Sequence, residues 1–206
     1  MALTKQDTLR NHWRPPAPDY LTWHLLFDAR PALHAVASRY QRALIGIEGI
    51  EVVPTSRLHL TVQGVGPVDE IPVEDVRVLL GGARDRLAEL RPFELIFQPA
   101  EVQWEGITLT AGPVEPLRAV RDALRAAIDA VLGADRVPGA DEMVWPHVSL
   151  AYASAAVSAA RLFDAIATVP RESVAVEIDQ TALIALRRDG QRYVWSPVAA
   201  VPLGVS

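Results

Sequence analysis

The chain has 206 residues, of which 50% are hydrophobic, no cysteine and a formal net charge of −5. This length is enough to bury a sizeable core within one domain. The missing cysteines exclude disulfides, thiolate metal sites and thiol nucleophiles. The acidic charge argues against a protein that coats duplex nucleic acid by electrostatics alone. No apolar run approaches the roughly 20 residues of a membrane span, and residues 1–7 lack the pattern of a secretory signal. We therefore expect a cytoplasmic protein without membrane contacts.

The first half of the chain alternates strand and helix patterns after an N-terminal arm. We expect residues 1–19 to form an irregular arm, because the prolines in Arg14–Pro18 interrupt both helices and central strands. A single domain then covers 20–206. Gly81-Gly82 costs about 1 kcal/mol per glycine relative to alanine in a helix interior, which leaves the second helix short, broken or closely packed. The expected strands are Tyr20–Asp28, 51–65 and Phe93–Phe97, and the expected helices run from Pro31 to about residue 45 and over 73–90.

The second half repeats the same order of elements. Asp189-Gly190 predicts the turn of a closing hairpin. That hairpin and the alternating strands favour antiparallel pairing with one exposed sheet face. We therefore expect an α+β, bilobal fold with two pseudo-duplicated antiparallel sheets backed by helices around a central cleft. The expected elements are strands over 107–111, 143–152, 174–186 and 192–201, and helices over 113–132 and 155–168.

One short motif occurs once in each half, as His59-Leu60-Thr61-Val62 and as His147-Val148-Ser149-Leu150. Alternate side chains of a strand share a face. Each histidine therefore lies beside a hydroxyl residue and opposite an apolar set. Two such strands predict one site that is built symmetrically from both halves of the chain.

Two histidines with hydroxyl neighbours suit phosphodiester chemistry. An unperturbed imidazole pKa is about 6.5, so two imidazoles can divide acid and base duty near neutral pH. In-line displacement at phosphorus places nucleophile and leaving group on opposite sides. Thr61 and Ser149 can donate hydrogen bonds to the oxygens that gain charge. This chemistry demands no metal.

The chain resembles the two-histidine phosphoesterase superfamily, and within it the bacterial 2′-5′ RNA ligase-like branch. That family carries two His-x-Thr/Ser-x motifs, and the resemblance covers roughly residues 20–198. It implies metal-independent chemistry without a cofactor on 2′,3′-cyclic or 2′-5′ phosphodiesters, and a nucleotide or RNA with a cyclic phosphate end as partner. It also implies catalytic roles for His59 and His147 and phosphate binding by Thr61 and Ser149.

Further candidates have weaker support. His24, Gln63 and Arg57 lie on polar strand faces that could border the cleft, although solvated strand positions explain them as well. Tyr152 is in phase with the apolar set of its strand, so we expect it in the core. His12 in the arm is not expected to take part. One or two of four aromatic residues could stack on a base; these are Trp104, Trp145, Tyr193 and Trp195.

Three functions remain open from the sequence. The first is hydrolysis of a 2′,3′-cyclic phosphate in an RNA end or a small nucleotide. The second is ligation of such an end to a 5′-hydroxyl, which microscopic reversibility permits at the same site. The third is a non-catalytic nucleotide- or RNA-binding module, against which two intact motifs argue. The acidic charge favours hydrolysis and short substrates. A metallohydrolase is disfavoured by the spacing of possible ligands. The oligomeric state that we expect is a monomer.

Overall fold

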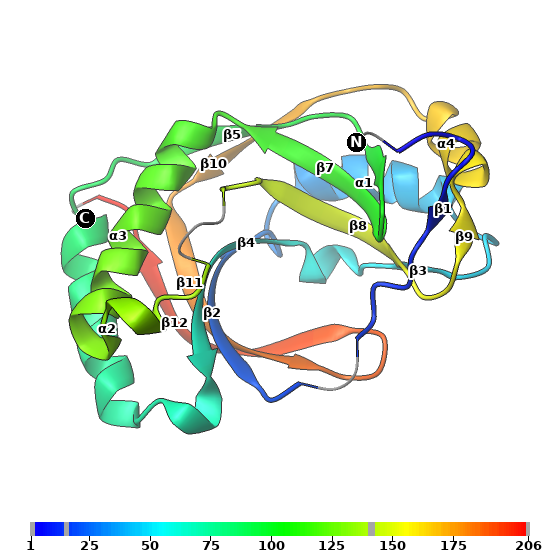
Figure 1. Ribbon diagram of the computed structural model, residues 1–206. Coiled ribbons are helices and arrows are strands. Elements are labelled where there is room, and N and C mark those ends of the chain that lie inside the picture. Colours follow the sequence, from blue (N-terminus) through cyan, green and yellow to red (C-terminus); the bar gives the residue numbers. More distant parts are fainter. Residues whose placement is uncertain (1–2, 15–16, 140–142, 205–206) are drawn as a thin grey trace.

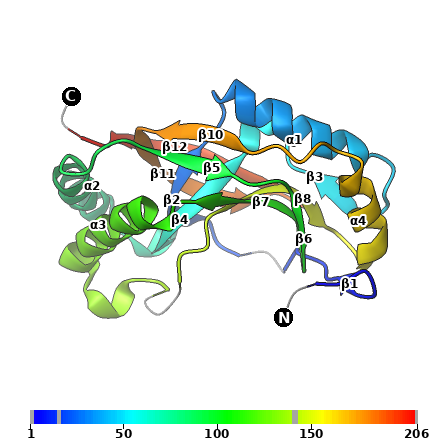
Figure 2. The same ribbon diagram turned by 90° about the horizontal axis from the view of Figure 1, so that it is seen from above.

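Two antiparallel sheets form the centre of the molecule, and helices cover their outer sides (Figures 1 and 2). The computed structural model describes residues 3–14, 17–139 and 143–204. The expected α+β, bilobal fold with two sheets backed by helices around a cleft is confirmed. No helix within the described residues is both long and apolar enough to cross a membrane.

The first lobe holds a four-stranded sheet in the order β12-β11-β2-β4. Helix α2 contacts β12 and helix α3 contacts β4, so both helices back this sheet. The apolar stripe of α3, which includes Leu117, Leu124 and Ile128, is buried, and the helix ends where Gly133 adopts a φ of 90°. The elements are β2 (Tyr20–Leu26), β4 (His59–Pro67), β11 (Gln180–Arg188), β12 (Tyr193–Pro202), α2 (Val73–Leu87) and α3 (Val114–Leu132).

The second lobe holds the order β10-β5-β7-β8-β3, with β6 also paired to β7. Helix α1 follows β2 of the first lobe along the chain, yet it contacts β8 and β10 of the second. Conversely, α3 follows β7 of the second lobe and packs on the first. Each half of the chain therefore sends one helix to the other lobe. The elements are α1 (Pro31–Ala43), β3 (Ile50–Val52), β5 (Phe93–Phe97), β6 (Glu101–Gln103), β7 (Gly106–Gly112), β8 (His147–Ala153), β10 (Val174–Ile178) and α4 (Ala159–Ala167).

Two expected strands are each divided between the lobes. The strand expected over 51–65 is wrong, because β3 pairs with β8 while β4 pairs with β2, and Pro54 and a 3-10 turn at Thr55–Arg57 separate them. The strand expected over 174–186 is likewise divided at Asp179 into β10 and β11. Alternation of apolar and polar residues is interrupted at both breaks, by Pro54-Thr55-Ser56 in the first and by Asp179-Gln180 in the second. These local interruptions do not reveal that the chain changes sheets.

Three smaller features bear on the expected elements. Helix α2 is unbroken through Gly81-Gly82. A Cβ at Gly81 would meet nothing within 4 Å, and one at Gly82 would lie 3.9 Å from the Cβ of Ala127 on α3, an ordinary contact, so the packing of α2 on α3 does not require the glycine pair. Strand β8 begins at His147, later than the expected Met143. The arm is not irregular throughout, because β1 (Thr8–Leu9) pairs with β9 (Val157–Ser158).

Candidate active site

The two histidine motifs lie on β4 and β8, which belong to different sheets and contact each other. On β4, Leu60 and Val62 are buried whereas Thr61 is exposed and His59 is half-buried. The same alternation leaves His147 and Ser149 half-buried on β8, opposite buried Val148 and Leu150. The apolar side chains fix the faces of both strands, and the polar side chains are thereby directed away from the core.

Both motif histidines are oriented in the same way. Each is the first residue of its strand, and its Nδ1 lies 2.9 Å from the carbonyl oxygen two residues earlier. The acceptor is Arg57 for His59 and Trp145 for His147. A carbonyl oxygen accepts only, so Nδ1 carries a proton and donates it in both rings. Nε2 is then left to accept or donate a proton on the cleft side.

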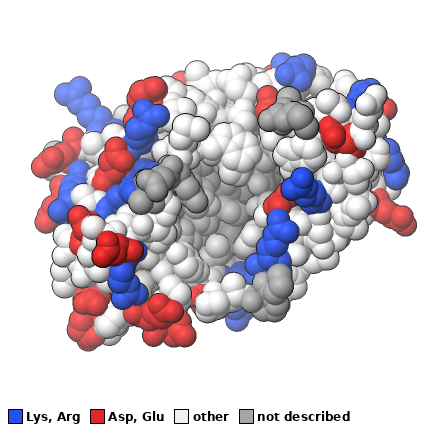
Figure 3. All heavy atoms as spheres, viewed as in Figure 1, with Lys and Arg blue, Asp and Glu red and all other residues white. Residues whose placement is uncertain are grey.

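Three adjoining cavities connect the motif residues across the hollow seen in Figure 3. His59 borders a cavity of about 220 Å³. His147 and Ser149 border one of about 290 Å³, and Thr61 shares one of about 400 Å³ with His147. Tyr152 separates the first cavity from the second. The four motif side chains therefore border neighbouring cavities, which share Tyr152 or His147 in their walls.

Both motif imidazoles are held towards their neutral forms. Burial lowers the pKa of His59 from 6.5, the hydrogen bond to Arg57 opposes this shift, and the charge of His147 lowers the pKa further. Burial also lowers the pKa of His147, against the hydrogen bond to Trp145. The influence of His147 on His59 indicates that the two rings are close enough to couple electrostatically.

His24 lies beneath the first motif as a third imidazole. Its side chain is 1% exposed, and its ring stacks on His59 with centroids 4.8 Å apart and an interplanar angle of 3°. Nε2 lies 3.2 Å from Thr61 Oγ1. Burial first, and then the charge of His59, hold the pKa of His24 well below its usual range. The neutral ring thus contacts both residues of the first motif.

Arg57 and Gln63 flank the same motif. The carbonyl of Arg57 orients His59, and its guanidinium lies over the Trp195 ring, 4.7 Å from the centroid. Gln63 is buried and borders the cavity of Thr61 and His147. Its amide donates to Pro138 O at 2.8 Å and accepts from Arg121 Nε at 2.9 Å. Gln63 therefore fixes a buried cation at the wall of the cleft.

The structure adds residues that the sequence analysis missed. Arg121 falls on the inward stripe of α3, between Leu117 and Leu124, where a charged residue is unusual; that position was the available signal. Tyr152, expected in the core, packs against it but is only half-buried and also borders two of the cavities. The β7–β8 register passes from Ile107 opposite Ala151 to Thr108 opposite Ser149, and this bulge reverses the alternation beyond it.

The position of His12 also differs from expectation. It borders the cavity of His147 and Ser149 rather than lying apart in the arm. Among the aromatic candidates, Trp145 stacks on His147 with centroids 4.0 Å apart, and Trp195 lies edge-on to His59 at 5.3 Å. Trp104 makes a cation–π contact with Arg10, whose guanidinium carbon lies 5.2 Å from the centroid of the Trp104 ring. Within the described ranges, no group of three or more His, Asp or Glu side chains is placed to hold a metal ion.

Comparison with known proteins assigns this architecture to a family. The model of the 2′-5′ RNA ligase superfamily matches residues 28–190. The chain is 23% identical to TT0787 of Thermus thermophilus, covering 89% of this chain and 97% of that one with a TM-score of 0.69. It is 16% identical to E. coli LigT in apo form, and the similarity covers 91% of this chain and 99% of LigT with a TM-score of 0.63. The structure of LigT complexed with 3′-AMP is also 16% identical, with 90% of this chain and 98% of that chain covered and a TM-score of 0.61. Curated protein sequences gave no significant match.

Proposed function

The chain belongs to the 2′-5′ RNA ligase superfamily, and we propose that it is a metal-independent phosphodiesterase that hydrolyses 2′,3′-cyclic phosphates in small nucleotides or at RNA ends. One observation carries the proposal. Two imidazoles on opposing strands each donate Nδ1–H to a carbonyl and leave Nε2 to the cleft, and each lies beside a hydroxyl residue. General acid and base groups on opposite sides of a phosphorus atom need this arrangement.

The reaction uses one histidine in each protonation state. The neutral imidazole takes a proton from water at its Nε2 while the water oxygen attacks phosphorus. The bond from phosphorus to one ribose oxygen breaks, and the second imidazole, protonated at the outset, gives its Nε2 proton to that oxygen. The product is a 2′- or 3′-phosphomonoester, and one further proton exchange with solvent restores the pair. His59 and His147 fill these two roles, and their near-symmetrical settings leave either assignment of acid and base available.

The remaining motif residues bind the phosphate. Thr61 and Ser149 adjoin the two imidazoles and are positioned to donate hydrogen bonds to the non-bridging oxygens as these gain charge. Trp145 packs flat on His147 and so limits rotation of that ring. LigT, whose fold is similar, has been crystallised with phosphate and with 3′-AMP. These ligands are of the class that opening of a cyclic nucleotide produces, which supports the proposal.

The assay offers the full chain 2′,3′-cyclic AMP and an RNA oligonucleotide with a 2′,3′-cyclic phosphate end, with a chelator present throughout. We expect turnover of at least one substrate. His59→Ala and His147→Ala should each lower kcat by roughly 10²- to 10⁴-fold, the usual contribution of general acid–base catalysis. His34→Ala is the matched control, because His34 lies on α1, where its Nε2 meets Phe27 O. It should retain the wild-type rate.

Several outcomes would contradict the proposal. Full activity of both motif variants, with circular dichroism unchanged, would refute the site. Turnover that the chelator abolishes would refute the metal-free mechanism. The alternative, ligation, is tested by adding an oligonucleotide with a 5′-hydroxyl. A 2′-5′-linked product formed in preference to the hydrolysed end would replace phosphodiesterase activity as the main function. Binding of nucleotide without either reaction would point instead to a binding module.

A further inference from the structure

The N-terminal arm lies outside the residues that match the family model, yet it borders the cleft. It pairs through β1 with β9, and then Arg10 N donates to Trp104 O at 2.7 Å and His12 N to Ala153 O at 2.8 Å. Figure 1 shows the arm running from β1 at the second lobe towards β2 of the first. Main-chain hydrogen bonds therefore hold the arm in a defined path up to His12.

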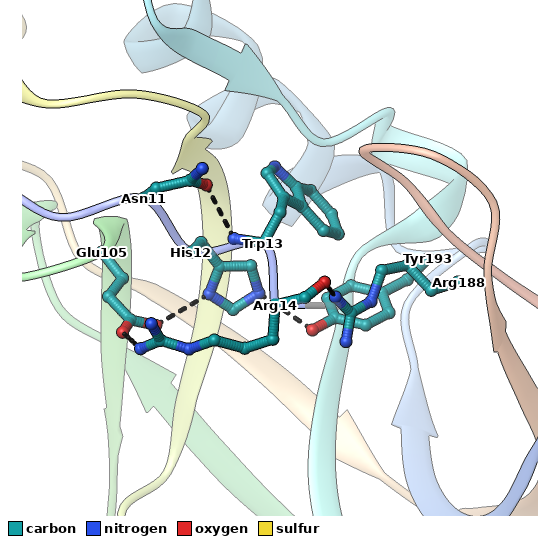
Figure 4. Close-up of polar contacts among 7 residues, drawn as sticks. All are labelled: Asn11, His12, Trp13, Arg14, Glu105, Arg188 and Tyr193. Atoms are coloured by element: carbon teal, nitrogen blue, oxygen red, sulfur yellow. Dashed lines mark hydrogen bonds and ion pairs between the residues drawn. The ribbon is translucent and has the colours of Figure 1, made fainter. Parts of the chain in front are cut away.

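His12 connects the two lobes through its side chain (Figure 4). Nδ1 lies 3.0 Å from a carboxylate oxygen of Glu105 in the second lobe, and Nε2 lies 2.9 Å from the hydroxyl of Tyr193 in the first. The ring also stacks on Tyr152 with centroids 4.1 Å apart. Arg14 pairs with Glu105 at 2.5 Å, and Arg188 donates to the carbonyl of Arg14. The residues on both sides of Trp13 are thus anchored.

This anchoring places Trp13 on the wall of the cavity that His59 borders. The cavity has about 220 Å³ and a mainly apolar lining, and it is smaller than the pockets of roughly 300 Å³ or more that hold drug-sized ligands. Its volume suits one planar ring system. Arg57 and Arg192 supply positive charge to the lining of this cavity, and Glu51 supplies one negative charge.

The indole of Trp13 is only partly engaged by protein. The three rings packed against it, those of His12, Tyr152 and Tyr193, lie at 82°, 70° and 45° to its plane, so none of them lies parallel to the indole. Its Nε1 is buried and therefore out of reach of a ligand. The part of the indole that borders the cavity is left for a stacked ligand ring.

We propose that the arm, through Trp13, forms the nucleobase subsite beside His59. The base of the substrate stacks on the part of the indole that borders the cavity. Base–aromatic stacking is a strong and sequence-tolerant contact. The inference rests on the proposed function for the identity of the substrate, but it makes a separate claim: the base is recognised by a segment that lies outside the residues matched by the family model.

The test compares a ligand with a base and one without. The affinities of the full chain and its variants for 3′-AMP and for inorganic phosphate are measured by calorimetry. Trp13→Ala should weaken binding of 3′-AMP by about tenfold or more while the Kd for phosphate stays within about twofold. Trp13→Phe, which keeps an aromatic face, should recover most of the affinity for 3′-AMP. Thermal unfolding of each variant confirms that the arm remains folded.

Two results would overturn the subsite. One is a Trp13→Ala protein that binds 3′-AMP as the wild type does. The other is an equal loss for 3′-AMP and phosphate, which would indicate that Trp13 only supports the fold. Turnover is measured independently with 2′,3′-cyclic AMP, where Trp13→Ala should raise KM and leave kcat nearly unchanged. A wild-type protein without turnover would refute the proposed function, whereas the selective loss of 3′-AMP binding would still support the subsite.

Discussion

Replacing His24 with glutamine removes a buried titrating group while keeping an amide near the position of the imidazole Nε2. That nitrogen lies 3.2 Å from Thr61 Oγ1 in the wild type, so the contact with Thr61 can be retained. Burial and the charge of His59 hold the pKa of His24 well below 6.5 in the folded protein. In the unfolded chain the same imidazole titrates near its ordinary value of about 6.5.

The direction of the effect follows from linkage. Because the folded-state pKa is depressed, the unfolded state binds a proton that the folded state excludes. The stability that neutral His24 contributes is therefore fully present above about pH 6.5 and is lost as the pH falls below it. For one such group the loss reaches about 1.4 kcal/mol at pH 5.5. Glutamine does not titrate. Between pH 8 and pH 5.5 the free energy of unfolding of His24→Gln should therefore fall by about 1.4 kcal/mol less than that of the wild type.

Urea unfolding, followed by circular dichroism at half-unit steps from pH 8 to pH 5.5, measures this difference. The other histidines titrate in both proteins and cancel in the comparison. Two curves that run parallel over the whole range would refute the reasoning, because they would mean that His24 takes up a proton as readily in the folded protein as in the unfolded chain.

Three further predictions concern the cleft. Because the pKa of His59 and of His147 is lowered, the pH profile of kcat/KM should be bell-shaped with its maximum below about 6.5, and a maximum above pH 7 would contradict it. Burial raises the pKa of Tyr152, and a hydrogen bond with Ser149 opposes this shift only in part. Because Tyr152→Phe removes that hydrogen bond, it should reduce kcat/KM several-fold with less than about 1.5 kcal/mol lost in stability, whereas an unchanged kcat/KM would show that this hydroxyl does not orient Ser149. Gln63→Leu removes the hydrogen bonds of Gln63 with Arg121 Nε and Pro138 O and should lower the free energy of unfolding by about 1–3 kcal/mol. The exposed Gln98→Leu is its control and should stay within about 0.5 kcal/mol of the wild type; equal effects would argue against a special role for Gln63.

Local alternation was sufficient to predict the faces of both motif strands. Leu60 and Val148 are buried while Thr61 and Ser149 are not, because a strand with one buried face has its register specified by that face. The repeated motif and the repeated order of elements likewise indicated a two-lobed fold with the motifs in corresponding strands. The match to the family model over residues 28–190 agrees with the resemblance that these motifs carry.

Alternation failed where tertiary pairing overrides it. A bulge opposite Ile107 and Thr108 brings Tyr152, which packs against the core, to the border of the cleft as well, and no residue type in β8 marks that position. The division of 174–186 into β10 and β11 follows from the partner strands that each half finds. Such partners are distant in sequence, so a local pattern does not report them.

The amino-acid sequence by itself determined which residues are candidates for the chemistry, since the residue types of His59, Thr61, His147 and Ser149 and their alternation along each strand are local properties. Only the tertiary structure decided what surrounds them. It set His24 beneath His59 and brought the arm, with His12 and Trp13, to the cleft. These contacts depend on the relative placement of two lobes, which is decided by the burial of apolar surface across the whole chain rather than by any one segment.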